Sequence, residues 1–91
     1  MVDPVMQDAV LRQRIGARVF YLRRERGITA LTLAARSGLH RNTIYRIEAG
    51  LILCTVGQAW RIAQALSVKI EDFLQDSPLQ VHSAIESKKA L

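Results

Sequence analysis

The chain has 91 residues, the size of one domain, and its 49% apolar residues are enough for a single small core. Its mixed charge argues against a disordered chain, and an aromatic content of 5% argues against a stacking surface for single-stranded nucleic acid. The one cysteine, Cys54, excludes an intramolecular disulfide, and no Cys/His cluster has zinc spacing, so we expect no metal and no other cofactor.

Positive charge is concentrated in the middle of the chain. The formal charge is +8 over residues 9–61, against −2 for residues 1–8 and −1 for residues 62–91. Arginine suits bidentate contacts with phosphate and guanine, so a polyanionic partner is one interpretation, and a solvated basic face is the other. The basic residues of this span are all arginines: Arg12, Arg14, Arg18, Arg23, Arg24, Arg26, Arg36, Arg41, Arg46 and Arg61.

Apolar residues at helical spacing predict a first helix over about residues 7–26, which Gly27 would end. Thr29 is a suitable N-cap for a second helix over residues 30–37, and Gly38 would make the turn that follows. The apolar face of the first helix consists of Leu11, Ile15, Val19 and Leu22.

A third helix is predicted over residues 41–49, with Ile44 and Ile47 facing inward. Ala34, Gly38 and Ile44 have the spacing A-x-x-x-G-x-x-x-x-x-I, which suits two short helices crossing at a steep angle. Such a pair can lay its second helix in the major groove of DNA. The polar residues available on that helix are Arg41, Asn42, Thr43, Tyr45 and Arg46.

Thr55 can cap a fourth helix that runs to about Leu66, and a short fifth helix would end near Phe73 and Leu74. The dipeptide Ser77-Pro78 then marks a boundary. Beyond it, residues 79–91 would form a weak amphipathic helix or a frayed tail.

Three stretches between Ile15 and Leu74 stand in a familiar order: I-G-A-R-V-F-Y-L-R-R-E-R-G-I-T, L-A-A-R-S-G-L-H-R-N-T-I-Y-R-I-E-A-G and I-A-Q-A-L-S-V-K-I-E-D-F-L. Together they resemble the helix-turn-helix domain of the phage Cro/repressor (xenobiotic-response-element, XRE) superfamily. The resemblance implies an all-α, lambda-repressor-like domain of five short helices, usually a homodimer on a partly palindromic operator. We assign residues 9–76 to this DNA-binding domain, residues 1–8 to an N-terminal tail, and residues 77–91 to a C-terminal tail or short helix.

The resemblance also implies that the start of the third helix reads the DNA. Arg41 and Asn42 would reach base edges, which agrees with the preference of Arg for guanine and of Asn for adenine. Arg46, one turn later, would reach a base or the backbone.

Further residues are implied to contact the DNA backbone. His40 and Thr43 would bind phosphate, and Tyr45 would either touch phosphate or pack at the helix edge. Thr29, at the start of the second helix, completes the expected DNA-binding set.

Arg23 and Glu48 match a pair that bridges the first helix to the end of the third in family members, so the resemblance implies a structural ion pair. Two other positions depart from the family. Ala30 stands where Gln usually contacts the DNA backbone and braces the first reading residue, and Ala can do neither. His40 replaces a capping Ser or Thr; because His caps poorly, we expect it to donate to a phosphate instead, more strongly when protonated.

The apolar stretch of residues 51–54 replaces a loop that is commonly polar and basic in the family. It would either fill the core or form a surface for a dimer or another partner, and we favour the surface. The residues of this expected surface are Leu51, Ile52, Leu53 and, on the fourth helix, Trp60.

Phe20 and Tyr21 stand at positions that are usually polar in the family. Adjacent helical residues cannot both face one apolar stripe, so we expect at least one of them to find another cover. Val81 and Ile85 of the tail, or a partner protein, are candidates; the alternative is a partly exposed aromatic residue with no role.

The function that we expect is a sequence-specific transcriptional regulator of double-stranded DNA, a repressor or an operon controller acting as a dimer in the cytoplasm of a bacterium or phage. The alternative is an antitoxin-type module that neutralises a partner protein and controls its own operon. An enzyme is not expected, because the sequence has no nucleophile–base spacing, no Gly-rich phosphate loop and no metal set.

Overall fold

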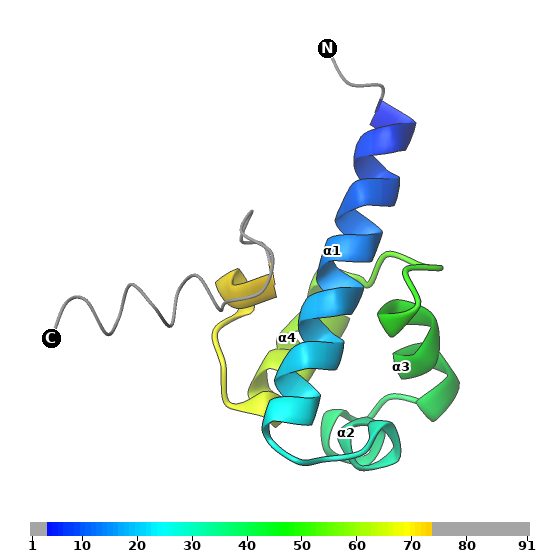
Figure 1. Cartoon of the computed structure of the whole chain (residues 1–91). Helices are drawn as coiled ribbons and strands as arrows, with labels where there is room; N and C mark the ends of the chain where they lie inside the picture. Colours follow the sequence, from blue (N-terminus) through cyan, green and yellow to red (C-terminus); the bar gives the residue numbers. More distant parts are fainter. Residues whose placement is uncertain (1–3, 74–91) are drawn as a thin grey trace, which may run out of the picture.

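The computed structural model describes residues 4–73, and all the regular elements of this part of the chain are helices joined by turns and loops (Figure 1). Its elements are α1 (Pro4–Glu25), α2 (Ala30–Ser37), α3 (Arg41–Glu48), α4 (Val56–Leu66) and the 3-10 helix η1 (Ile70–Phe73). The all-α class is therefore confirmed. The fifth helix is a single 3-10 turn, and the expected tail helix lies outside the described residues.

Helix α1 begins at Pro4, within the segment that we expected to be a tail. Proline suits the first turn of a helix, because its missing N–H would have no intrahelical partner there. The N-terminal turns of α1 extend beyond the other helices (Figure 1). They carry exposed apolar side chains, Met6 and Val10.

Local capping sets the bounds of the shorter helices. Thr29 accepts a hydrogen bond from the N–H of Thr32 at 3.0 Å and caps α2, and Gly38 ends α2 with φ +71°. Thr55 and Gln58 form a reciprocal capping box at the start of α4. These signals lie within a few residues of one another, which is why the sequence predicts these helices well.

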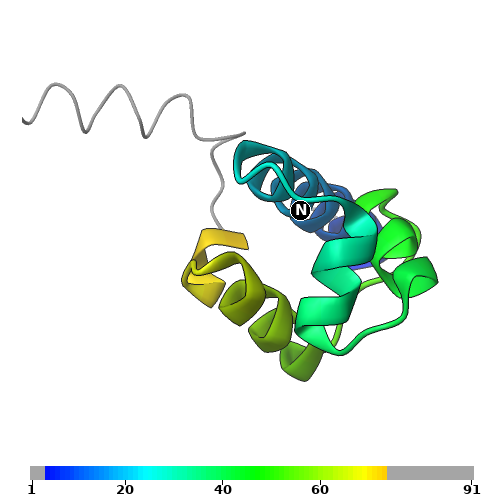
Figure 2. The same cartoon turned by 90° about the horizontal axis from the view of Figure 1, so that it is seen from below.

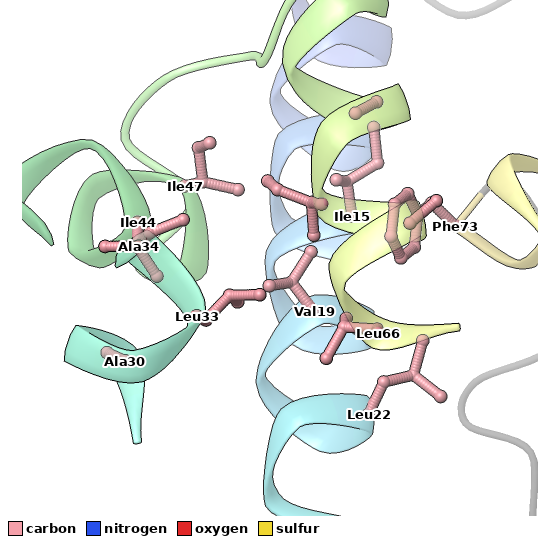
Figure 3. Packing of buried hydrophobic residues seen from close by; sticks show 13 residues of the cluster. Ile15, Val19, Leu22, Ala30, Leu33, Ala34, Ile44, Ile47, Leu66 and Phe73 are labelled. Carbon is pink, nitrogen blue, oxygen red and sulfur yellow. The ribbon is translucent and has the colours of Figure 1, made fainter. Parts of the chain in front are cut away.

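The core is assembled from one face of each helix (Figure 3). Leu33 of α2 reaches towards Val19 of α1, and both side chains are fully buried. Helix α1 packs against α3, α4 and η1, and α2 packs against α3 and α4. The other fully buried large side chains are Ile44, Ile47, Ile62, Leu66 and Phe73.

Gly16 allows α1 to touch the end of α3. A Cβ atom at this position would lie 2.2 Å from the carbonyl oxygen of Ile47 and 2.8 Å from that of Glu48. Both neighbours are backbone atoms, so they cannot move aside as a flexible side chain could. Sequence reasoning missed this residue; a glycine inside an otherwise helical stretch was the available signal.

Arg18 fits neither interpretation of the central arginines, contact with a polyanion or a solvated basic face. Its side chain is buried at 3% exposure, and its Nε donates to the carbonyl oxygen of Asp72 at 2.7 Å. Burial lowers the pKa of Arg18, and the nearby charge of Asp72 acts in the opposite direction. This arginine therefore joins η1 to α1 and is closed to DNA.

Replacing Gly16 by alanine should destabilise the fold by about 1–3 kcal/mol, because the added methyl group overlaps the backbone of α3. The gain in helix propensity, about 1 kcal/mol, is too small to offset this overlap. Gly57→Ala is the matched control, since its Cβ would approach only the Thr55 hydroxyl, at 3.9 Å. Urea unfolding measures both; equal stability of the two variants would contradict the close contact.

Candidate nucleic-acid interface

Helix α3 has an inner and an outer face. Ile44 and Ile47 are buried in the core at 0% and 1% exposure. The outer face carries the side chains predicted to bind DNA: Arg41, Asn42, Tyr45 and Arg46 are exposed, and Thr43 is partly buried. Within residues 4–73, no hydrogen bond or ion pair engages the side chains of Arg41, Asn42 or Arg46. The outer face is therefore polar, basic and available for a ligand.

His40 corrects the expectation that histidine would not cap α3. Its backbone is extended at φ −72° and ψ 144°, and its Nδ1 accepts a hydrogen bond from the N–H of Asn42 at 3.0 Å. An accepting Nδ1 places the ring proton on Nε2. His40 therefore caps the helix with one nitrogen and presents a donor with the other, whereas protonation of Nδ1 would remove the cap.

Thr29 and Thr32 form a hydroxyl pair at the start of α2. The Thr29 hydroxyl accepts from the N–H of Thr32 and donates to the Thr32 hydroxyl at 3.0 Å. One of the two hydroxyl protons is thereby used within the pair, and the other can point outward. Thr32 was missed by the sequence analysis, although the threonine three residues after the N-cap was visible.

Arg23 and Glu48 tie α1 to the end of α3. Arg23 donates from Nε to Oε2 at 2.7 Å and from Nη2 to Oε1 at 2.9 Å, and its Nη1 donates to the carbonyl oxygen of Ile28 at 3.2 Å. The two side chains are only 12% and 8% exposed. The hydrogen bond to Glu48 raises the pKa of Arg23 above its usual value, so this arginine stays charged.

The two adjacent aromatic residues of α1 are covered in different ways. Tyr21 packs partly against the core, and its hydroxyl donates to Glu25 at 3.3 Å. Phe20 is 43% exposed, and the guanidinium groups of Arg23 and Arg24 lie 5.1 and 5.3 Å from its ring centroid. Arginines on its own helix therefore provide part of the cover that we expected from elsewhere. Val81 and Ile85 lie outside the described residues.

In the apolar loop before α4, residues 51–54, exposed side chains alternate with partly buried ones. Ile52 and Cys54 are partly buried and pack against the core, so Ile52 adds less to the expected surface than its neighbours Leu51 and Leu53. Leu51 and Leu53 point outward at 69% and 42% exposure. Burial raises the pKa of the Cys54 thiol, so this cysteine is poorly suited to act as a nucleophile.

Helix α4 extends this apolar surface. Val56 is 80% exposed and Trp60 is 56% exposed. Beside Leu53 and Val56 lies a groove of about 230 Å³, whose floor includes Phe73. We call Leu51, Leu53, Val56 and Trp60 the loop surface.

No helix among residues 4–73 is long and apolar enough to cross a membrane. In the same range, no three His, Cys, Asp or Glu side chains gather as a possible metal site.

Comparison with known proteins places this geometry in a family. Residues 19–73, more than half of the chain, match the helix-turn-helix family HTH_3. No curated protein sequence shows significant similarity to the chain.

Three solved structures are similar to the chain. The restriction-modification controller protein C.AhdI from Aeromonas hydrophila is 27% identical with a TM-score of 0.67, covering 68% of this chain and 94% of that one. An HTH_3 family transcriptional regulator from Vibrio cholerae is 25% identical with a TM-score of 0.73, covering 78% of this chain and 40% of that one. The hypothetical transcription factor NHTF from Neisseria, 23% identical with a TM-score of 0.72 over 82% of this chain and 84% of that one, shares the fold.

The chain therefore belongs to the HTH_3 helix-turn-helix family, which confirms the XRE-type resemblance of its sequence. It is a DNA-binding protein of the transcription-regulator class, and that family is generally not enzymatic.

Replacing Glu48 by alanine should lower the free energy of unfolding by about 2–4 kcal/mol, because the Arg23 charge would remain largely buried without its partner. Glu25→Ala is the control, since its contacts with Arg26 and with the Tyr21 hydroxyl are long and exposed, and the ion pair contributes roughly 0–1 kcal/mol. Urea unfolding of both variants gives the comparison. Similar losses would show that the Arg23–Glu48 pair is energetically unimportant.

Proposed function

We propose that the protein is a dimeric repressor or operon controller that inserts α3 into the major groove of a palindromic operator. The observation that carries this proposal is the unengaged outer face of α3, where Arg41, Asn42 and Arg46 project from a helix fixed at both ends. His40 caps its start, and Glu48 ties its last residue to α1. A reading helix held in this way positions its side chains without a large loss of entropy on binding.

Sequence selection would come from the first turn of α3. Arg41 offers a planar fork that matches the O6 and N7 acceptors of guanine, and Asn42 matches adenine in the same way. Arg46 lies one turn later on the same outer face and would contact a further base or a phosphate.

Contacts with the DNA backbone would lie around these base-contacting side chains. The Nε2–H of His40 is a donor suited to a phosphate oxygen, and the hydroxyl groups of Thr43 and Tyr45 can contribute in the same way. At the start of α2, the hydroxyl pair of Thr29 and Thr32 keeps one proton free and would offer it to a phosphate oxygen. Such contacts set the register of the protein on the duplex and make binding dependent on salt.

A dimer is supported by the loop surface. Four large apolar side chains are exposed on a small domain, and a closed two-fold contact would cover the same patch on both subunits. Two reading helices related by a two-fold axis match two half-sites of a palindrome. The similarity to the controller protein C.AhdI supports a controller among the regulator classes.

In fluorescence anisotropy, the protein should bind DNA from upstream of its gene about 10³-fold more tightly than scrambled DNA.

Arg41→Ala should weaken operator binding by about 10- to 100-fold and relax the preference at one position of each half-site. Arg61→Ala is the control, because Arg61 lies on α4, which Figure 2 shows across the bundle from α3. An unchanged base preference of Arg41→Ala in a randomised-site selection would refute its role, and binding without any preference would refute the proposed function.

Leu51→Asp combined with Leu53→Asp should convert dimers into monomers at low micromolar concentration, because each subunit would bring two carboxylates into an apolar contact. Size-exclusion chromatography with light scattering measures the mass. Leu31→Asp is the control: Leu31 is 57% exposed but lies on α2, so its variant should remain dimeric. Persistent dimers of the double variant would exclude the loop surface, and a monomeric wild type would favour a surface for another protein.

A further inference from the structure

The outer face of α1 is one narrow stripe. Between residues 9 and 24 all side chains are buried or partly buried except five, and Met6 continues the line they form towards the N-terminus. The spacing alternates between four and three residues, so the side chains follow a single edge of the helix. This α1 stripe consists of Met6, Val10, Gln13, Ala17, Phe20 and Arg24.

The α1 stripe is unusually apolar for a face in contact with water. Met6, Val10 and Phe20 are 62%, 47% and 43% exposed, and Ala17 lies between the last two. An exposed helix face normally carries the charged residues of the helix. In α1, by contrast, three of the arginines donate hydrogen bonds to other parts of the protein. Arg12 donates to the carbonyl oxygen of Gly50, Arg18 to that of Asp72, and Arg23 to Glu48.

Alternating steps of four and three residues are the spacing of a seam between two packed helices. The steps along the stripe, 4-3-4-3-4, read the same in both directions. A second α1 packed antiparallel would therefore place every stripe residue against another stripe residue. Val10 would meet Phe20 of the second copy, Gln13 would meet Ala17, and Met6 would meet the aliphatic stem of Arg24.

Charge along α1 favours the same orientation. The exposed Asp8 lies near the N-terminal end, whereas Arg24 and Arg26 are exposed near the C-terminal end. Antiparallel packing brings the acidic end of one helix towards the basic end of the other and opposes the two helix dipoles. Parallel packing would instead set Arg24 against its own copy.

We propose that the α1 stripe is a second self-association surface, through which two copies of this chain pack their α1 helices antiparallel. Its residues differ from those of the loop surface, and the two surfaces meet along one border, where Gln13 lies against Gly50, the neighbour of Leu51. A single helix pair buries less area than a stable interface needs, so this contact is weak between isolated subunits. The contact becomes stronger when two dimers are held close together, because their effective concentration is then high. DNA would hold two dimers in this way on neighbouring operators, and this part of the inference rests on the proposed function.

Sedimentation equilibrium of the full chain tests the surface. Ala17→Glu places two carboxylates at the centre of the seam and should weaken the second association step about tenfold or more, leaving loop-surface dimers intact. Ala35→Glu is the matched control, the same change at an exposed position of α2. In the Leu51→Asp/Leu53→Asp background, residual dimers at high concentration should disappear with Ala17→Glu. Equal association of the Ala17 and Ala35 variants, both with wild-type unfolding midpoints, would overturn the proposal.

Disulfide trapping tests the orientation independently of DNA binding. In a Cys54→Ser background, a Gln13→Cys chain is mixed with a mass-tagged Ala17→Cys chain and oxidised gently. Antiparallel packing predicts mainly disulfides between the two different chains, at several times the yield obtained when Ala35→Cys replaces Ala17→Cys. Mainly disulfides between identical chains would indicate parallel packing, and yields equal to the control would indicate no contact; either result overturns the proposal.

Discussion

The contact between α1 and α3 at Gly16 is the constraint on which the rest of the molecule depends. The backbone of α3 approaches so closely that even a methyl group would overlap the carbonyl oxygens of Ile47 and Glu48. Such an approach brings the carboxylate of Glu48 within reach of Arg23, two turns further along α1, and a bidentate ion pair completes the attachment. A glycine and an ion pair together therefore define where α3 stands relative to α1.

A short helix can serve as a rigid reader only if its ends are held. Eight residues would not remain helical alone in water. The few hydrogen bonds of so short a helix do not offset the entropy lost in forming its first turn. The cap from His40 secures the start, the buried side chains of Ile44 and Ile47 secure the inner face, and Glu48 secures the end. Within residues 4–73, the side chains of Arg41, Asn42 and Arg46 take no part in these attachments and face outward.

Arginine is used in two ways in this small domain. Arg18 and Arg23 lie within the protein, where they join η1 and α3 to α1, whereas Arg41 and Arg46 remain on the outside. A total charge cannot distinguish these uses, because both kinds contribute equally to it. Apolar residues are divided in a similar way: the core takes alternate residues of the loop before α4, and the others stay on the surface with part of α1. Self-association suits a chain of this size, whose single core leaves a thin margin of stability.

The sequence by itself determined the all-α class, the bounds of α2 and α4, the inner face of α3 and the family. These depend on caps such as Thr29 and Thr55 and on apolar periodicity, which act between residues a few positions apart. Only the tertiary structure decided that Arg18 is buried, that Gly16 is a contact point, and that Ile52 turns inward while Leu51 does not. Each of these outcomes depends on a neighbour distant in the chain, as with Arg18 and Asp72, 54 residues apart. The cap from His40 was local but still missed, because its backbone must first hold the extended conformation that lets Nδ1 face the N–H of Asn42.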